Sequence, residues 1–277
     1  MSLTVAEALR AGTRDLAGAG VPDAARDARL LLAHALEVPA DRLTLLLPEA
    51  LPMPAAARFD AALSHRVMRR PLSQIVGHRL FWGRRFRVTR DTLDPRPETE
   101  TLVAAALEQP FAAVLDLGTG TGAILLSLLA ERPGTAGTGT DISPAALAVA
   151  ASNAAAMGLS PRLIASDWFA QVEGRFDLIV SNPPYVALAE MEDLAPEVRD
   201  WEPRVALTDE GDGLAAYRAI AAGAGAHLLP RGRVAVEVGP GQAPVVAEIF
   251  AAAGLRAEGT RADMDGRARV VIARAPG

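Results

Sequence analysis

The stretch "AAVLDLGTGTGAILLSLLAE", residues 112–131, decides the fold class, because a buried strand, a glycine-rich turn and an apolar helix follow one another without a break. Further strand-like runs, "TAGTGTD", "PRLIASD", "FDLIVSN" and "RVAVEVG", alternate with helix-like segments. This alternation predicts an α/β fold with a doubly wound, mostly parallel sheet that binds ligands at the C-terminal ends of its strands. The last two runs, "LRAEGTRAD" and "RARVVIARA", are separated only by "MDG", so we expect the sheet to finish with one antiparallel strand.

The chain before this region has a different pattern. Thr4 and Glu7 have the spacing of a capping box, and apolar residues then recur at three-four spacing, which predicts a small helical bundle. The stretch "SQIVGHRLFWGRRFRVT" alternates around Gly83 and predicts a β-hairpin. We therefore divide the chain into an N-terminal helical domain (1–72), a hairpin linker (73–90) and an α/β domain that carries the candidate site (91–277).

The composition excludes several classes of function. The 277 residues are half hydrophobic, which is enough for one large core and a smaller one. There is no cysteine, and the four histidines lack metal-ligand spacing, so we expect no disulfide, no cysteine nucleophile and no metal site. No signal peptide or membrane-spanning apolar run is evident, which predicts a cytoplasmic protein. The net charge of −5 predicts neither stable nucleic-acid binding nor membrane binding.

Positive charge is nevertheless concentrated in one region. Residues 61–90 contain eight arginines and no acidic residue, and the chain as a whole has no lysine. Two interpretations stay open. The arginines form a solvated face whose stems cover apolar surface, or they form a docking patch for an anionic partner.

The turn "DLGTGTG", residues 116–122, predicts a ligand-binding loop, because its three glycines permit a sharp turn and a close approach to the main chain. The dinucleotide fingerprint places its third glycine one residue later. The spacing therefore favours another adenosine ligand, while a nicotinamide or flavin dinucleotide and a purely structural turn stay open as alternatives.

Acidic and aromatic residues end the next two strands. Asp141 stands where a carboxylate accepts both hydroxyls of a ribose, or else it caps the following helix in competition with Ser143. Asp167 and Trp168 offer an acceptor for an exocyclic amine and a flat surface for a purine, although a lone tryptophan at such a place is more often a core residue. Three successive strand ends of this kind predict a nucleoside pocket.

The fourth strand runs into "SNPPY", residues 181–185. Asn182 supplies a side-chain carbonyl, while Pro183 and Pro184 remove two N–H donors and leave main-chain carbonyls exposed. Such an acceptor-rich wall suits a planar NH2 group held by the Asn182 oxygen and the Pro183 carbonyl, with the Tyr185 ring packed on its π system. The alternative is a Pro-Pro pair that only terminates the strand.

Several motifs together, "LDLGTGTGAI", "FDLIVSNPPY", "EPRVAL", "GDGL" and "PRPETE", closely resemble the HemK/PrmC-type release factor glutamine methyltransferases over nearly the whole chain. The resemblance implies a class I, Rossmann-like methyltransferase that uses S-adenosyl-L-methionine. It implies that the substrate is the side-chain amide nitrogen (N5) of the glutamine in the Gly-Gly-Gln motif of peptide chain release factors, in support of translation termination. It also implies that the N-terminal helices recognise this substrate.

The resemblance carries roles to individual positions. It implies that Asn182, Pro183, Pro184 and Tyr185 hold the glutamine amide. It also implies cofactor contacts for a larger set of residues, namely Gly118, Thr119, Gly120, Thr121, Gly122, Asp141, Asp167, Trp168 and Asn182. Asp94 departs from the aliphatic residue that is usual before "PRPETE" in this family. Arg96 and Glu98 either shape the entrance to the site or help to start the helix that follows Pro97.

Two alternative functions stay open at this point. An adenine-N6 nucleic-acid methyltransferase would use the same acceptor wall, although the acidic net charge and the lack of a basic-aromatic domain disfavour it. A non-enzymatic cofactor-binding or ribosome-associated module would use the arginine-rich region, but the intact "NPPY" disfavours it. We expect a monomer that meets release factors as its partners.

Overall fold

The computed structural model describes residues 3–276, which form two compact units. The first, here the helical unit, is Met1–Gly77 together with Ala195–Trp201. The second, here the sheet unit, is His78–Leu194 together with Glu202–Gly277. This division differs from the sequence-based one, because the first unit runs five residues past 72 and includes a segment that lies more than a hundred residues further along the chain. No helix among the described residues is long and apolar enough to span a membrane.

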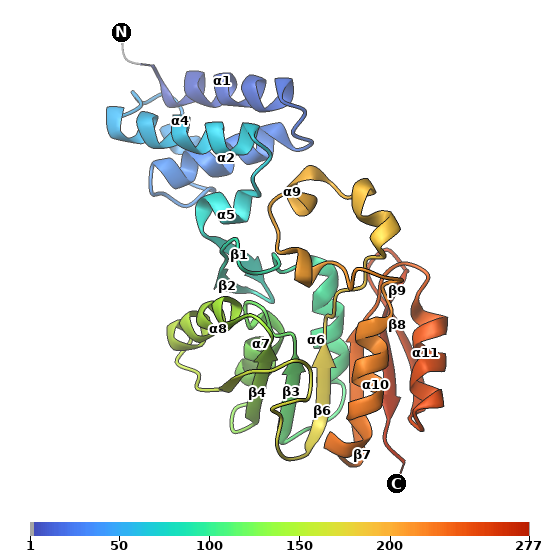
Figure 1. Ribbon diagram of the computed structural model, residues 1–277. Helices are drawn as coiled ribbons and strands as arrows, with labels where there is room; N and C mark the ends of the chain where they lie inside the picture. Colours follow the sequence, from blue (N-terminus) through green and yellow to red (C-terminus); the bar gives the residue numbers. More distant parts are fainter. Residues whose placement is uncertain (1–2, 277) are drawn as a thin grey trace. The chain divides into compact units, whose positions relative to one another are not determined.

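The helical unit is a small bundle with its own core. Its elements are α1 (Val5–Gly18), α2 (Ala24–Ala35), α3 (Leu43–Leu46), α4 (Met53–Val67), α5 (Leu72–Val76) and α9 (Pro196–Arg199). The predicted capping box begins α1: the Thr4 hydroxyl accepts from the Glu7 N–H, and the Glu7 carboxylate accepts from the Thr4 N–H at 2.8 Å. Helices α1, α2 and α4 pack together (Figure 1). Leu16, Leu31 and Phe59 are buried in their common core.

The sheet unit contains a seven-stranded sheet with the order β5-β4-β3-β6-β7-β9-β8. Its strands are β3 (Ala113–Leu117), β4 (Ala136–Asp141), β5 (Arg162–Ala165), β6 (Phe176–Ser181), β7 (Leu228–Glu237), β8 (Arg256–Ala262) and β9 (Ala268–Arg274). The first five are parallel, and β9 is antiparallel to both of its neighbours. The predicted α/β fold with one reversed strand is therefore confirmed. The reversed strand lies inside the sheet, since β8 occupies the edge.

Helices cover both faces of this sheet. They are α6 (Glu100–Leu107), α7 (Ala123–Glu131), α8 (Pro144–Ala156), α10 (Ala215–His227) and α11 (Ala243–Ala252). The unit also contains three short 3-10 helices, η1 (Pro97–Thr99), η2 (Leu188–Asp193) and η3 (Arg204–Ala206). Alternate residues of the central strands face two separate cores, one with α6, α7 and α8 and the other with α10 and α11 (Figure 1). Strands buried on both faces explain the nearly continuous apolar runs of the sequence.

The predicted hairpin consists of β1 (His78–Phe81) and β2 (Arg84–Arg87), which pair antiparallel across Trp82 and Gly83. The rings of Phe81 and Phe86 meet edge to face with centroids 6.0 Å apart and are buried in the core that contains α6 and α7. Helix α5 takes up the start of the stretch that the sequence assigned to the linker. The hairpin proper is therefore shorter than residues 73–90.

Candidate active site

A cavity of about 670 Å³ lies in the sheet unit, at the C-terminal ends of β3, β4, β5 and β6. From β3 the sheet is extended through β4 to β5 on one side, and β6 then pairs with the other side of β3. This reversal of strand order is the switch point at which doubly wound sheets bind ligands. The cavity is lined by most of the predicted site residues, namely Gly118, Thr119, Gly120, Thr121, Asp141, Asp167, Trp168, Asn182 and Pro184. Three others, Gly122, Pro183 and Tyr185, do not line it.

The glycine loop bends back over the end of β3. Gly118 and Gly120 have φ angles of 68° and 56°, a left-handed backbone that favours glycine. A Cβ added at either residue would meet no protein atom within 4 Å, so these two positions leave room beside the cavity. Gly122 differs, because its Cβ would come within 3.0 Å of Leu126 in the following helix. The third glycine thus permits packing, which explains why it does not line the cavity.

Asp116, the residue two positions before Gly118, holds the glycine loop through a hydrogen bond. The sequence analysis did not predict it as a site residue. Its carboxylate is completely buried and accepts a hydrogen bond from the Thr119 hydroxyl at 2.7 Å. Burial raises the pKa of Asp116 to about 7, although the hydrogen bond from Thr119 opposes the shift. The sequence feature that could have identified Asp116 as a site residue is an acidic side chain in an otherwise apolar strand.

Asp141 lies between the glycine loop and α8. Its two oxygens accept from the backbone N–H groups of Gly120 and Ser143, both at 2.9 Å. Ser143 is the N-cap of α8, where its hydroxyl accepts from the Ala146 N–H. The capping role therefore belongs to Ser143. Burial raises the pKa of Asp141, and its carboxylate keeps further lone pairs beside the cavity for a diol.

The turn after β5 sets the direction of Trp168. This residue has a left-handed backbone with φ of 46°, which Ser166 supports by donating to the Trp168 carbonyl at 2.9 Å and accepting from the Gln171 N–H at 3.0 Å. The indole packs partly on the core beside α10 and also lines the cavity. Trp168 thus packs on the core and also reaches the cavity, where its contact with a cofactor stays a prediction. Asp167 is exposed at the cavity.

Asn182 follows β6 directly and is half-buried at the cavity. Its Nδ2 donates to the Thr99 hydroxyl oxygen at 3.2 Å. Among residues 3–276, no group donates to its Oδ1, so the side-chain carbonyl is the part of the amide left for a ligand.

The Tyr185 backbone is held in place by Gln242, which the sequence analysis did not single out, and by the close approach of Gly213 from the "GDGL" motif. The Gln242 side chain donates to the Tyr185 carbonyl at 2.9 Å, and its own oxygen accepts from the Gly239 N–H and the Tyr217 hydroxyl. A Cβ at Gly213 would lie 2.4 Å from the same carbonyl, so only glycine permits this approach. Burial raises the pKa of Tyr185 to about 12, which keeps the phenol neutral.

The "PRPETE" turn forms a further wall of the cavity. Pro97 begins η1, which leads into α6, and Arg96 donates to both oxygens of the buried Glu202 at 2.8 and 2.6 Å. Burial raises the pKa of Glu202 to about 7 in spite of this pair. The unusual Asp94 is buried and lies 3.7 Å from the Arg79 guanidinium, so its charge is compensated. Arg96 lines the cavity, whereas Glu98 does not.

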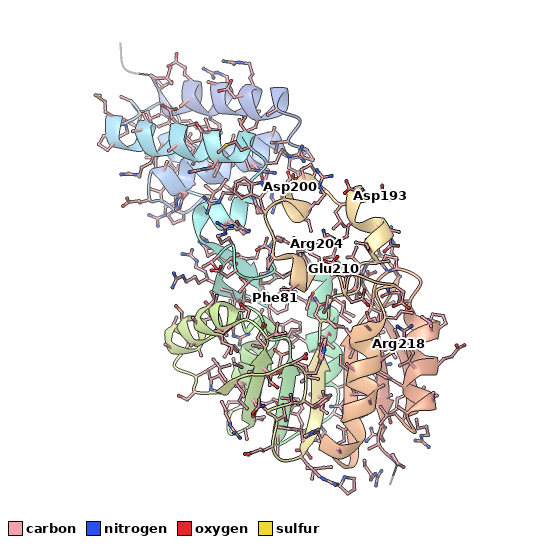
Figure 2. The ribbon with its side chains drawn as sticks, in the orientation of Figure 1. Phe81, Asp193, Asp200, Arg204, Glu210 and Arg218 are labelled. Atoms are coloured by element: carbon pink, nitrogen blue, oxygen red, sulfur yellow. The ribbon has the colours of Figure 1, made fainter. Side chains whose placement is uncertain are left out.

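Another part of the cavity lining comes from the segment that follows Glu202. Residues 203–206 and 208–210 line the cavity, and Arg204 and Glu210 form an ion pair across this segment (Figure 2). Val186 donates to the Leu207 carbonyl at 2.9 Å, which ties the segment to the chain just beyond Tyr185.

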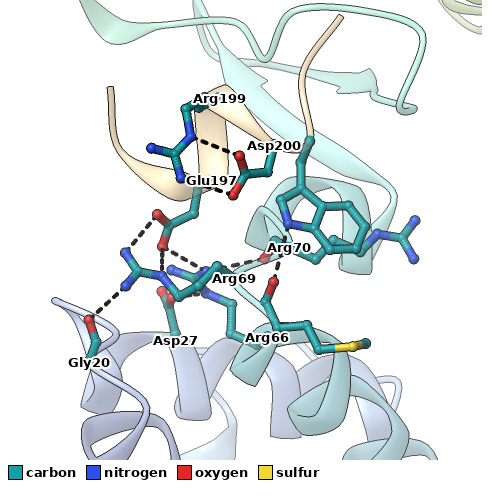
Figure 3. A network of polar contacts seen from close by, with 10 residues as sticks. Gly20, Asp27, Arg66, Arg69, Arg70, Glu197, Arg199 and Asp200 are labelled. Atoms are coloured by element: carbon teal, nitrogen blue, oxygen red, sulfur yellow. Dashed lines mark hydrogen bonds and ion pairs between the residues drawn. The ribbon is translucent and has the colours of Figure 1, made fainter. Parts of the chain in front are cut away.

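Most of the arginine-rich region is engaged inside its own unit. In the helical unit, Arg66 and Arg69 both pair with Glu197, at 3.0 and 2.7 Å, and Arg70 lies over the Trp201 ring (Figure 3). These three residues are neither a solvated face nor a free docking patch.

In the sheet unit the hairpin arginines divide into two groups. Arg84 pairs with Glu131 at 2.9 Å. Arg85, Arg87 and Arg90 are exposed, and none forms an ion pair within the described residues. Of the three, each can still belong either to a solvated face or to a docking patch for an anionic partner.

Comparisons with known proteins agree with the two-part organisation. Residues 7–77 match the PrmC N-terminal domain and residues 90–198 match the methyltransferase small domain. The chain is 62% identical to a release factor glutamine methyltransferase of Cereibacter sphaeroides over 99% of both chains, and 44% identical to one of Rhodospirillum rubrum over 99% of this chain and 86% of the relative. A methyltransferase structure from Pyrococcus furiosus, 19% identical, superposes with a TM-score of 0.54 over 69% of this chain and 89% of its own, which is a likeness of fold.

Proposed function

Because the chain belongs to the release factor glutamine methyltransferases, we propose that it methylates the side-chain amide nitrogen of the glutamine in the Gly-Gly-Gln motif of peptide chain release factors, with S-adenosyl-L-methionine as the methyl donor. The observation that carries this proposal is the orientation of Asn182. Its amide nitrogen is used inside the protein and its oxygen is left for a ligand at the cavity.

The residues present fit the proposed cofactor. Gly118 and Gly120 leave open space beside the main chain, Asp141 keeps carboxylate lone pairs for a ribose diol, and Trp168 offers a flat surface for a purine. When bound, S-adenosyl-L-methionine supplies an electrophilic methyl group on a sulfonium. The cavity volume, about 670 Å³, is in the usual range for small-molecule sites.

An amide nitrogen is a poor nucleophile because its lone pair is delocalised into the carbonyl. The protein therefore has to hold this nitrogen in place and stabilise the positive charge that develops on it. The Asn182 oxygen does both when it accepts one N–H of the substrate amide, and the Pro183 carbonyl is proposed to accept the other. Two consecutive prolines keep competing N–H donors out of this wall.

No general base is required for this step. A methylated amide nitrogen that still carries an extra proton is strongly acidic and loses that proton readily to water. Tyr185 is proposed to pack its ring against the substrate amide and not to act as a base. Burial keeps its phenol neutral, and Gln242 fixes its backbone.

The proposal is tested by incubating the protein with methyl-labelled cofactor and a purified release factor. Peptide mass spectrometry is expected to find one methyl group on the side-chain nitrogen of the Gly-Gly-Gln glutamine. A release factor in which this glutamine is replaced by glutamate is the matched control and is expected to remain unlabelled, because a carboxylate offers neither an N–H nor a nitrogen. Transfer to adenine in DNA or RNA, with none to glutamine, would show that the alternative function is correct.

A further inference from the structure

The loop that joins β7 to α11 contacts Tyr185, the last residue of the proposed acceptor wall (residues 182–185). Gln242 Nε2 donates to the Tyr185 carbonyl at 2.9 Å and lies 3.5 Å from the Gly213 carbonyl oxygen. Its Oε1 accepts from the Gly239 N–H at 3.0 Å. The donor end of the Gln242 amide thus meets carbonyl groups and its acceptor end meets an N–H, so both ends of the side chain are used.

Two glycines leave room for this contact. A Cβ at Gly213 would collide with the Tyr185 carbonyl oxygen. A Cβ at Gly239 would lie 3.0 Å from Cδ2 of the Tyr185 ring and 2.9 Å from Gln242 Oε1. Gly213 is fixed in turn, because the Asp209 carboxylate accepts from its N–H at 3.0 Å. The backbone and the ring of Tyr185 therefore each pack against a residue without a side chain.

The two prolines leave few main-chain torsions free in the acceptor wall. Each proline ring fixes its own φ at about −65°. A proline also restricts the residue before it to an extended conformation, which here applies to Asn182 and Pro183. The torsions that remain are ψ of Pro184 and those of Tyr185.

The peptide between Tyr185 and Val186 is held at both of its polar groups. Its carbonyl accepts from Gln242, and its N–H donates to the Leu207 carbonyl at 2.9 Å. These two hydrogen bonds fix the plane of the peptide and with it the torsions that the prolines leave free. A wall held in this way keeps the Pro183 carbonyl oxygen in one direction.

We propose that Gln242 and Gly239 are positioning residues for the methyl transfer. The Gln242 amide holds the Tyr185 backbone, and the missing side chain of Gly239 leaves space for the Tyr185 ring, so that the Pro183 carbonyl and this ring meet the substrate amide at a fixed angle. The inference rests on the proposed function, because that function places the substrate amide at this wall. Neither Gln242 nor Gly239 lines the cavity, so both act through Tyr185.

Kinetics of the full chain with a release factor test the role of Gln242. Gln242→Glu keeps the shape of the side chain but replaces the donor by a second acceptor, which repels the Tyr185 carbonyl. Its kcat is expected to fall at least about tenfold, roughly the worth of one buried hydrogen bond, while KM for the release factor stays within about twofold. Gln242→Met is uncharged and of similar length, removes the same donor and is expected to lower kcat to a similar extent.

The matched control is Gln109→Met. Gln109 is also half-buried in the sheet unit and its Oε1 accepts from Arg274 at 2.8 Å, but it does not line the cavity. This variant is expected to keep the wild-type kcat. An unchanged kcat in Gln242→Met, or an equal loss of kcat in Gln109→Met, would overturn the inference.

The role of Gly239 is tested by adding one methyl group. In Gly239→Ala either the Tyr185 ring or the Gln242 side chain has to shift, and kcat is expected to fall by about ten- to hundredfold. The control is Gly225→Ala in α10, whose added Cβ would meet nothing beyond its own helix within 4 Å. This variant is expected to keep its kcat and to gain stability slightly. Equal kcat values in the two variants would show that Gly239 is not a positioning residue.

A readout without substrate separates this inference from the proposed function. The chain contains only two tyrosines, Tyr185 and Tyr217, so labelling tyrosine with 13C at the carbonyl gives two NMR signals, and Tyr185→Phe identifies one of them. The Tyr185 signal is expected to shift in Gln242→Met, because its carbonyl loses a hydrogen bond. The Tyr217 signal is the internal control and is expected to stay in place, since its carbonyl lies inside α10.

Each outcome of the NMR comparison decides one part of the account. A Tyr185 signal that does not respond to Gln242→Met would disprove the positioning contact even if the wild type methylates glutamine. A shifted Tyr185 signal in a protein that does not methylate glutamine would instead reject the proposed function, and with it the role of this contact in methyl transfer.

Discussion

The network around Arg66 in the helical unit and two acids behind the cavity of the sheet unit, Asp116 and Glu237, differ in how their buried charges are compensated. In the helical unit, Arg66 bridges the carboxylates of Asp27 at 2.7 Å and Glu197 at 3.0 Å, so opposite charges satisfy one another (Figure 3). In the sheet unit, Asp116 and Glu237 are nearly or completely buried, and each keeps one oxygen without a hydrogen bond in the part of the chain that the structure describes.

The pKa values express the same difference. Burial alone would raise the pKa of Glu197, but hydrogen bonds from Arg69 and Arg66 outweigh it and lower the pKa. Burial raises the pKa of Asp116 to about 7, and only Thr119 and a backbone group oppose it. The lowered pKa of Glu197 predicts that its ion pairs stabilise the helical unit at neutral pH, whereas the raised pKa of Asp116 predicts that this acid reduces the stability of the sheet unit there.

The largest expected effect follows from breaking the helical network. Arg66→Ala leaves the buried carboxylate of Asp27 without its ion-pair partner and leaves Glu197 paired with Arg69 alone. The change is expected to reduce the free energy of unfolding of this unit by about 3–5 kcal/mol. Urea denaturation followed by circular dichroism measures the loss. The control is Arg26→Ala, an exposed partner of Asp23, with an expected change within about 0.5 kcal/mol. A small loss in Arg66→Ala would refute the assignment of a structural role to this network.

A second prediction concerns the pH dependence of stability. The folded-state pKa of Asp116 is raised from 3.8 to about 7, so between these values the folded protein holds a proton that the unfolded chain has lost. Stability from this group is therefore present at low pH and is lost as the pH rises toward 7. Asp116→Asn is expected to gain stability relative to the wild type by roughly 2–4 kcal/mol between pH 4.5 and pH 8, measured by urea denaturation.

Glu197→Gln provides the contrast from the other unit. The pKa of Glu197 is lowered, so its contribution is present at neutral pH and is lost as the pH falls through the folded-state pKa. The variant is expected to lose more stability at pH 8 than at low pH. The same sign of pH dependence in both variants would abolish the distinction between the two units.

A third prediction separates ligand binding from helix capping in the sheet unit. Asp141→Ala is expected to weaken binding of S-adenosyl-L-methionine by about 1.5–3 kcal/mol for each charge-assisted bond to the ribose. Ser143→Ala removes the α8 N-cap and is expected to cost about 1 kcal/mol of stability with little change in cofactor affinity. Titration calorimetry measures the cofactor affinity of both folded variants, and scanning calorimetry measures their stability. If Asp141→Ala bound S-adenosyl-L-methionine as tightly as the wild type, Asp141 would not be a ligand of the ribose.

The smallest effect is expected at the exposed arginines of the hairpin. Replacing Arg85, Arg87 and Arg90 by glutamate is expected to change stability by no more than about 0.5 kcal/mol per residue and to leave cofactor affinity intact. Arg84→Glu is the matched control, because it breaks the pair with Glu131 and is expected to cost more. A lower kcat/KM for the release factor at low salt, absent at high salt, would identify a docking patch, and an unchanged value a solvated surface.

The sequence predicted the sheet, the hairpin and the cavity-lining strand ends because these depend on local patterns. Alternating strands and helices force a switch point, and the residues that end neighbouring parallel strands meet there. The spacing of Thr4 and Glu7 also predicted a capping box, which the structure confirms.

Contacts between distant segments were not predictable in this way. The sequence analysis assigned residues 195–201 to the α/β domain, yet Glu197 completes a charge network in the helical unit. Gly213 belongs to the "GDGL" motif and Gln242 to no quoted motif, and only the fold brings both to the Tyr185 carbonyl. The partners of buried polar groups are set by tertiary packing, which periodicity does not encode.

The most direct test of the account compares catalysis with binding in Asn182→Ala. Single-turnover methylation of the release factor is expected to slow by about 100- to 1000-fold, because the lost hydrogen bond strengthens as charge develops on the amide nitrogen. The dissociation constant of the release factor is expected to stay within about threefold, since one small side chain is a minor part of a protein interface. A rate close to that of the wild type, or a rate loss matched by an equal loss of binding, would contradict the claim that the Asn182 oxygen acts on the transition state.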